Sequence, residues 1–155
     1  MEPYLLLKAL HILSGMILFG TGVGTAFYLW MAHRTGDPHV IAKVGRHVVL
    51  GDWMFSGGAG LLQPITGLGL VSLSGRDPFA PWLLMTYGLY LLAFACWAPV
   101  VWIQADAARL AAASARSGAA LPPRYFTLMR IWFWLGWPAF AALIGILLVM
   151  VSQPG

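Results

Sequence analysis

Lys8 and His11 lie one helical turn apart within a long apolar run near the start of the sequence. Ionisable side chains are rare inside membrane spans, where they usually face a protein interior and mark a function. An imidazole there either ligates haem iron or hydrogen-bonds a neighbouring serine, glutamine or carbonyl group. We therefore treat His11 as a candidate metal ligand. Lys8 either extends to the lipid headgroups or pairs with a haem propionate.

Asp52 and Arg130 form a second candidate pair. Counted at the rise of an α-helix, each lies about 8 Å from the same end of its apolar run, so the two side chains reach a similar depth. A carboxylate and a guanidinium inside a membrane usually pair. We predict a structural ion pair. A proton relay is the alternative, although arginine stays protonated under ordinary conditions.

Four apolar runs must position these residues, at roughly 4–32, 48–73, 82–112 and 125–152. About 20 apolar residues suffice to span the hydrocarbon core of a bilayer. Only 9% of the residues are charged, whereas a soluble domain has about 25%. The sequence therefore predicts an all-α integral membrane four-helix bundle, and one transmembrane domain over residues 1–155.

The second run carries a polar face, whose members recur at steps of three and four residues: Asp52, Ser56, Ala59, Gln63 and Thr66. A polar row turned toward lipid would be unfavourable, so we expect this face to point into the bundle. Gln63 and Tyr87 reach a depth comparable to that of His11. We therefore include both in the candidate cofactor site.

The basic residues define an expected topology. The net charge is +4, and most lysines and arginines fall in the first and third connections. Positive residues in short loops favour the cytoplasm, so we predict that both termini lie outside. The basic residues in these loops account for the net positive charge, because they set the topology and attract anionic lipid. We therefore expect no nucleic-acid partner.

Several segments resemble a bacterial family of predicted integral membrane proteins of unknown function. They are Tyr4–Leu13, Met31–Arg34, Gly51–Phe55 and Gln63–Gly67, together with the aromatic start of the fourth helix. The resemblance covers nearly the whole chain. It implies a multi-pass protein of the bacterial inner membrane.

The Lys8-Ala9-Leu10-His11 element is also similar to the HemJ-type protoporphyrinogen oxidases, which are small membrane proteins that bind b-type haem. This resemblance implies that His11 is a haem-associated histidine with Lys8 beside it. The HemJ pattern has a histidine and a lysine near the start of its third helix, and Trp82–Tyr87 contains neither. Met85 is then the candidate second axial ligand.

These observations leave three functions open. The first is a haem-binding redox protein, with a quinone or a porphyrin as substrate. The second is a non-catalytic structural or interaction module, in which glycine-bearing helix faces mediate association, including homo-oligomerisation. The third is a small transporter that would have to oligomerise around its polar stripe.

Overall fold

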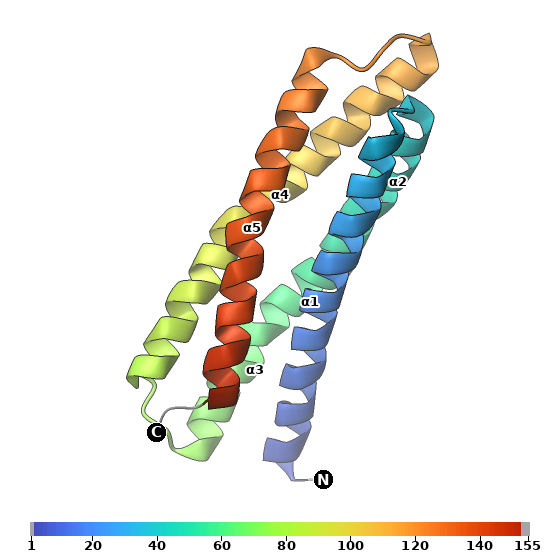
Figure 1. Cartoon of the computed structure of the whole chain (residues 1–155). Helices are drawn as coiled ribbons and strands as arrows, with labels where there is room; N and C mark the ends of the chain where they lie inside the picture. Colours follow the sequence, from blue (N-terminus) through green and yellow to red (C-terminus); the bar gives the residue numbers. More distant parts are fainter. Residues whose placement is uncertain (1, 153–155) are drawn as a thin grey trace.

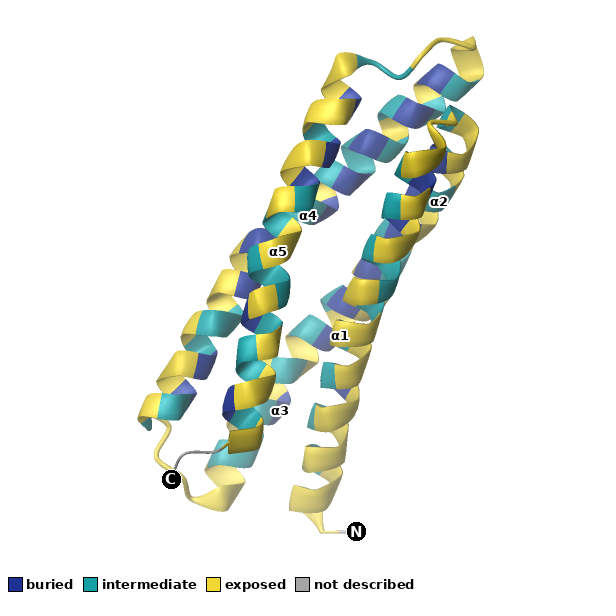
Figure 2. Cartoon of the chain, viewed as in Figure 1, coloured by how far each residue is buried: buried dark blue, intermediate teal, exposed yellow. Residues whose placement is uncertain are grey.

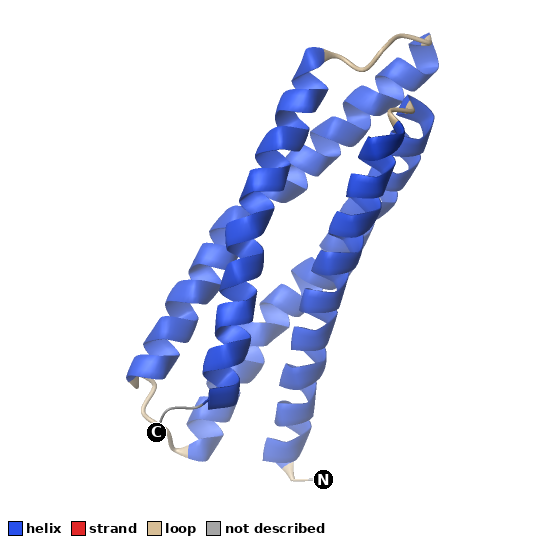
Figure 3. Ribbon diagram, in the orientation of Figure 1, coloured by secondary structure: helices blue, strands red, loops and turns tan. Residues whose placement is uncertain are grey.

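The computed structural model describes residues 2–152, and these residues form helices without any strand (Figure 1 and Figure 3). Four continuous helical stretches are long and apolar enough to cross a membrane, which confirms the four-helix bundle. The elements are α1 (Pro3–Thr35), α2 (Pro38–Gly51), the π-helical η1 (Asp52–Gly57), α3 (Gly58–Ser74), α4 (Pro81–Ser117) and α5 (Pro123–Ser152).

The connection between α1 and α2 is much shorter than predicted. Gly36 ends α1 in the left-handed conformation, at φ 66°, which glycine adopts without steric penalty. The Asp37 side chain then accepts a hydrogen bond from the His39 backbone N–H at 2.8 Å and caps α2. Pro38 occupies the first turn of that helix, where its missing N–H is tolerated. The second helical stretch therefore begins at Pro38 instead of residue 48.

The bundle has two ends of different composition. The start of α1, the Ser74–Pro81 turn and the end of α5 share one end, and the two other connections share the opposite end (Figure 1). We call the half that contains the start of α1, the turn between α3 and α4 and the end of α5 the terminal half. The half that contains the α1–α2 and α4–α5 connections is the loop half. α4 packs on α5 and α2, while α1 packs on α2, η1 and α3.

The main hydrophobic core lies in the loop half. Figure 2 shows buried residues gathered there, whereas the start of α1 is mostly exposed. The core is a single cluster of side chains from α1, α2, α4 and α5: Leu29, Ala32, Ile41, Val48, Ala107, Ala111, Tyr125, Met129 and Trp132.

The outward surface of the spans is apolar, as a lipid environment requires. Large exposed hydrophobic side chains occur on every span, among them Leu6, Ile65, Leu91 and Val151. In water such a surface would drive aggregation. Here it faces acyl chains.

Pro64 interrupts the hydrogen bonding of α3, and a side chain of α4 compensates. Proline has no backbone N–H, so the carbonyl of Gly60, four residues earlier, loses its helical partner. The Tyr90 hydroxyl donates a hydrogen bond to this carbonyl. The pairing satisfies a backbone group at membrane depth and ties α4 to α3.

Candidate functional site

His11 points into the bundle and contacts α3, as the sequence predicted. Its Nδ1 lies 2.8 Å from Oγ1 of Thr66. The ring also packs against Gly67, since a Cβ added at that glycine would lie 3.2 Å from Cε1 of His11. The absence of a side chain at Gly67 therefore makes room for the imidazole.

The hydrogen bonds of Thr66 decide which imidazole nitrogen carries the proton. The Thr66 hydroxyl donates to the Leu62 carbonyl at 2.6 Å. A hydroxyl has one proton, so it has none left for His11. We therefore assign the ring proton to Nδ1, which donates to Thr66 and leaves a lone pair on Nε2. This tautomer is the one that a histidine needs to bind a metal through Nε2.

Gln63 fixes the backbone of α1 beside His11. Its amide nitrogen donates to the His11 carbonyl at 2.8 Å and to Oγ of Ser14 at 2.9 Å. The Ser14 hydroxyl itself donates to the His11 carbonyl at 3.0 Å. A Cβ at Gly15 would lie 2.9 Å from the Gln63 amide nitrogen, so glycine leaves room for this approach. Gln63 was predicted from the sequence, whereas Ser14 was not.

The Nε2 atom of His11 has no hydrogen-bond partner among the described residues, and it is not enclosed. The buried side-chain atoms without a partner there are Tyr87 Oη, Trp97 Nε1 and Gln104 Oε1. Tyr87 precedes Tyr90 by three residues and so shares the face of α4 that meets α3. Because Gly60 lies opposite Tyr90 in antiparallel helices, Thr66 is level with about residue 84. Tyr87 and His11 therefore lie at similar depths.

Two predicted site residues, Lys8 and Met85, form no hydrogen bond with this cluster among the described residues. Lys8 is exposed. Met85 is 51% exposed, and it precedes Tyr90 by five residues, which places it about 140° around α4 from the face that meets α3. The structure therefore gives no support to Met85 as a second axial ligand.

The predicted ion pair between Asp52 and Arg130 is absent from the structure. The ion pairs among the described residues join Asp106 to Arg109 and to Arg124. Arg130 is exposed on α5, whereas Asp52 is buried. The rise along each helix predicts the depth of the two residues. It does not predict the direction in which each side chain points from its helix axis.

Asp52 instead forms a hydrogen-bonded cluster with uncharged side chains. Its Oδ1 accepts from the Thr25 hydroxyl at 3.0 Å and from the Ser56 hydroxyl at 3.3 Å. Buried Asp52, Ser56, Ala59 and Thr66 confirm that the polar face of this stretch points inward.

His33, at the opposite end of α1 from His11, has an aromatic setting. Its Nδ1 lies 3.0 Å from the Tyr125 hydroxyl, and the ring stands beside Trp30 and Phe126. Residues 2–152 contain no group of three or more histidine, cysteine, aspartate or glutamate side chains placed to hold a metal. The structure therefore does not gather His33, His39 and His47 around an ion.

The four apolar spans and the inward polar face define a multi-pass helical membrane protein. The chain belongs to the family described as predicted integral membrane protein (DUF2269), whose model matches residues 5–154. No curated protein and no solved structure matched the chain.

Proposed function

We propose that this membrane protein binds b-type haem, with Nε2 of His11 as an axial ligand. The observation that carries the proposal is the hydrogen bonding around Thr66, which leaves an accessible lone pair on Nε2. Metal-binding histidines characteristically donate their other ring N–H to an oxygen atom. His11 has this arrangement already, with its backbone held by Gln63.

We infer that a flat, largely apolar cofactor lies between two helix pairs beside His11. Over the whole length of the helices, backbone contacts are extensive within the pairs α1–α3 and α4–α5, and sparse between them. Tyr87 carries a buried hydroxyl without a partner at about the level of His11. We propose that this hydroxyl turns to hydrogen-bond the cofactor between the two helix pairs.

Each residue has a defined part in the proposed site. Bound haem would supply one-electron chemistry. Thr66 orients the imidazole and raises its basicity, and Gln63 holds the α1 backbone. Lys8, one turn from His11, lies near enough along α1 to reach a propionate. The substrate class that we propose is a quinone or a porphyrin.

We further propose a bacterial inner-membrane location with the terminal half outside. The loop half contains Arg34, Lys43, Arg46, Arg109, Arg116 and Arg124. The positive-inside rule assigns such an end to the cytoplasm.

The test is an absorption spectrum of the full chain, purified in mild detergent after expression with added haem precursor. We expect a Soret band and sharp α and β bands on reduction, all lost in His11→Ala. His47→Ala, which removes an exposed histidine of α2, is the matched control and should keep the spectrum. A colourless wild-type protein, or an unchanged spectrum in His11→Ala, would contradict the proposal.

A packing role for the same cluster is the second candidate function. Every hydrogen bond described for Gln63, Ser14 and Thr66 joins α1 to α3 or closes within one of these helices. Such bonds contribute about 0.6 kcal/mol each on average within membranes. Colourless protein that loses thermal stability in Gln63→Leu would favour this structural function.

A further inference from the structure

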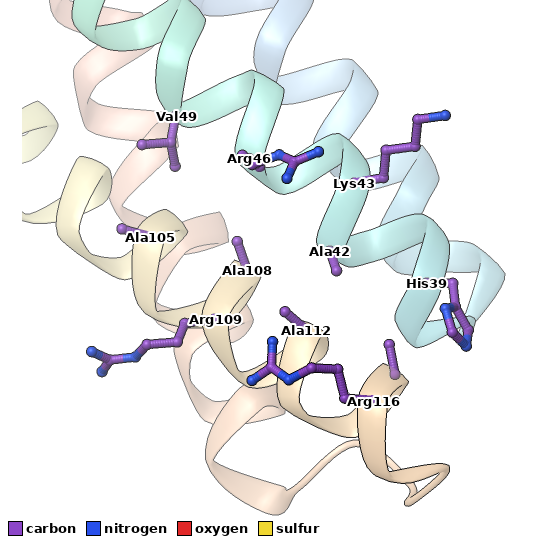
Figure 4. Close-up of a pocket in the computed structure, with 11 residues that line it drawn as sticks. His39, Ala42, Lys43, Arg46, Val49, Ala105, Ala108, Arg109, Ala112 and Arg116 are labelled. Carbon is purple, nitrogen blue, oxygen red and sulfur yellow. The ribbon is translucent and has the colours of Figure 1, made fainter.

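A groove with a basic rim runs between α2 and α4 in the loop half. Its volume is about 550 Å³, and it is open on the outer side of the bundle (Figure 4). The rim carries five basic side chains, three from α2 and two from α4: His39, Lys43, Arg46, Arg109 and Arg116. The floor is mainly alanine.

Small residues create the groove. Gly45 of α2 approaches Ala108 so closely that an added Cβ would lie 2.9 Å from the Cβ of Ala108. Ala105, Ala112 and Ala115 continue the same face of α4. Because these side chains end at Cβ, the two helices pack tightly yet leave a channel between their outer edges.

Most of the positive charge on this rim is not neutralised by the protein. Asp106 is the acidic residue that forms ion pairs in the described chain, and it contacts Arg109 at 2.7 Å and Arg124 at 2.9 Å. Within residues 2–152, Lys43, Arg46 and Arg116 have no carboxylate within ion-pair distance. The groove therefore favours an anion.

The position of the groove along the bundle indicates which anion. Val49 and Ala105 close one end, where the apolar parts of their helical stretches begin, and His39 lies about 15 Å further along α2. Lys43 and Arg46 fall between these levels, in the region where a helix leaves the hydrocarbon core. A phospholipid places its phosphate at this level and its acyl chains beside the apolar end.

We propose that this groove binds an anionic phospholipid, with its phosphate among Lys43, Arg46 and Arg116 and an acyl chain against Val49 and Ala105. Basic pockets between helices at a membrane surface are suited to such headgroups. The site is independent of His11, and it requires no haem.

The experiment measures lipid retention by the full chain in nanodiscs that contain phosphatidylglycerol and phosphatidylcholine, counted by native mass spectrometry. We expect one saturable phosphatidylglycerol molecule per chain. Arg46→Gln with Arg116→Gln should weaken phosphatidylglycerol binding by about 30-fold. Each lysine or arginine near an anionic membrane surface strengthens binding by about fivefold, and this double variant removes two of them. Arg34→Gln with Arg130→Gln removes the same charge from exposed sites outside the groove, and should leave the affinity within about twofold.

Three outcomes would overturn the proposal. One is equal retention of phosphatidylglycerol and phosphatidylcholine by the wild-type chain. This outcome does not depend on the folding of any variant. Another is equal weakening in both double variants, which would indicate diffuse surface charge. The third is displacement of the lipid by an equal concentration of inorganic phosphate, which would indicate a site for a soluble anion instead.

Discussion

The loop half and the terminal half of the bundle hold their helices together by different means. In the loop half, side chains from four helical elements close around Tyr125, Trp132 and Ile41 in one buried apolar cluster. In the terminal half, α1 meets α3 through hydrogen bonds of His11 and Gln63. The comparison suggests that the loop half provides stability, whereas the more open terminal half leaves a polar group accessible for function.

Tyr125→Ala should produce the largest loss of stability. Tyr125 is 0% exposed at the centre of the core, and truncation of a large buried aromatic side chain costs about 3–5 kcal/mol. Phe19 stacks on Phe140 in the terminal half but is 37% exposed. We expect Phe19→Ala to lower the thermal unfolding midpoint in detergent by less than half as much. Equal losses would contradict the division into two halves.

Gly67→Val should have the next largest effect. The new side chain would press on the His11 ring, and overpacking of this kind costs about 1–3 kcal/mol. It should also displace His11 from Thr66 and diminish any Soret band. Gly88→Val on α4 is the matched control, since an added Cβ there meets nothing within 4 Å. Thermal unfolding and absorption spectra of both variants test this prediction, and similar results for the two would refute it.

Tyr90→Phe should cost about 1 kcal/mol, because it leaves the Gly60 carbonyl without a partner beside Pro64. Tyr87→Phe removes a hydroxyl of the same kind that has no partner among residues 2–152, and should not lower stability. Unfolding in detergent measures both changes. If the Tyr87 variant proves the less stable of the two, the assigned hydrogen bonding of α4 is wrong.

Arg130→Gln should have the smallest effect, below about 0.5 kcal/mol, because the side chain is exposed and lies outside any ion pair in the structure. A double-mutant cycle with Asp52→Asn measures the coupling between the two positions. We expect a coupling energy near zero. A value of about 1 kcal/mol or more would restore the ion pair that the sequence suggested.

The sequence was sufficient to predict the four spans and the inward face of the second one. Apolar run length identifies a span, and the spacing from Asp52 to Thr66 identifies its buried side. The start of α2 was not predicted, because the apolar run that marks this stretch begins only at about residue 48. Asp37 followed by Pro38 is a capping signal that would have located it.

Side-chain partners were harder to predict than faces. The depth of His11 correctly placed it near Gln63, because α1 and α3 are adjacent. The same arithmetic failed for Arg130, since height does not fix the rotation of a helix about its own axis. The contribution of Ser14 was also missed, because it depends on the close approach that Gly15 permits.

The π-helical turn from Asp52 to Gly57 has a consequence for the other end of its stretch. Each turn of this kind accommodates one more residue than an α-turn. If the same residues were wound as a regular α-helix, everything beyond Gly58 would turn by about 100° relative to α2. Gln63 and Thr66 would then swing away from α1. The extra residue in the π-helical turn therefore sets the direction in which Gln63 and Thr66 face, more than one turn further along the helix.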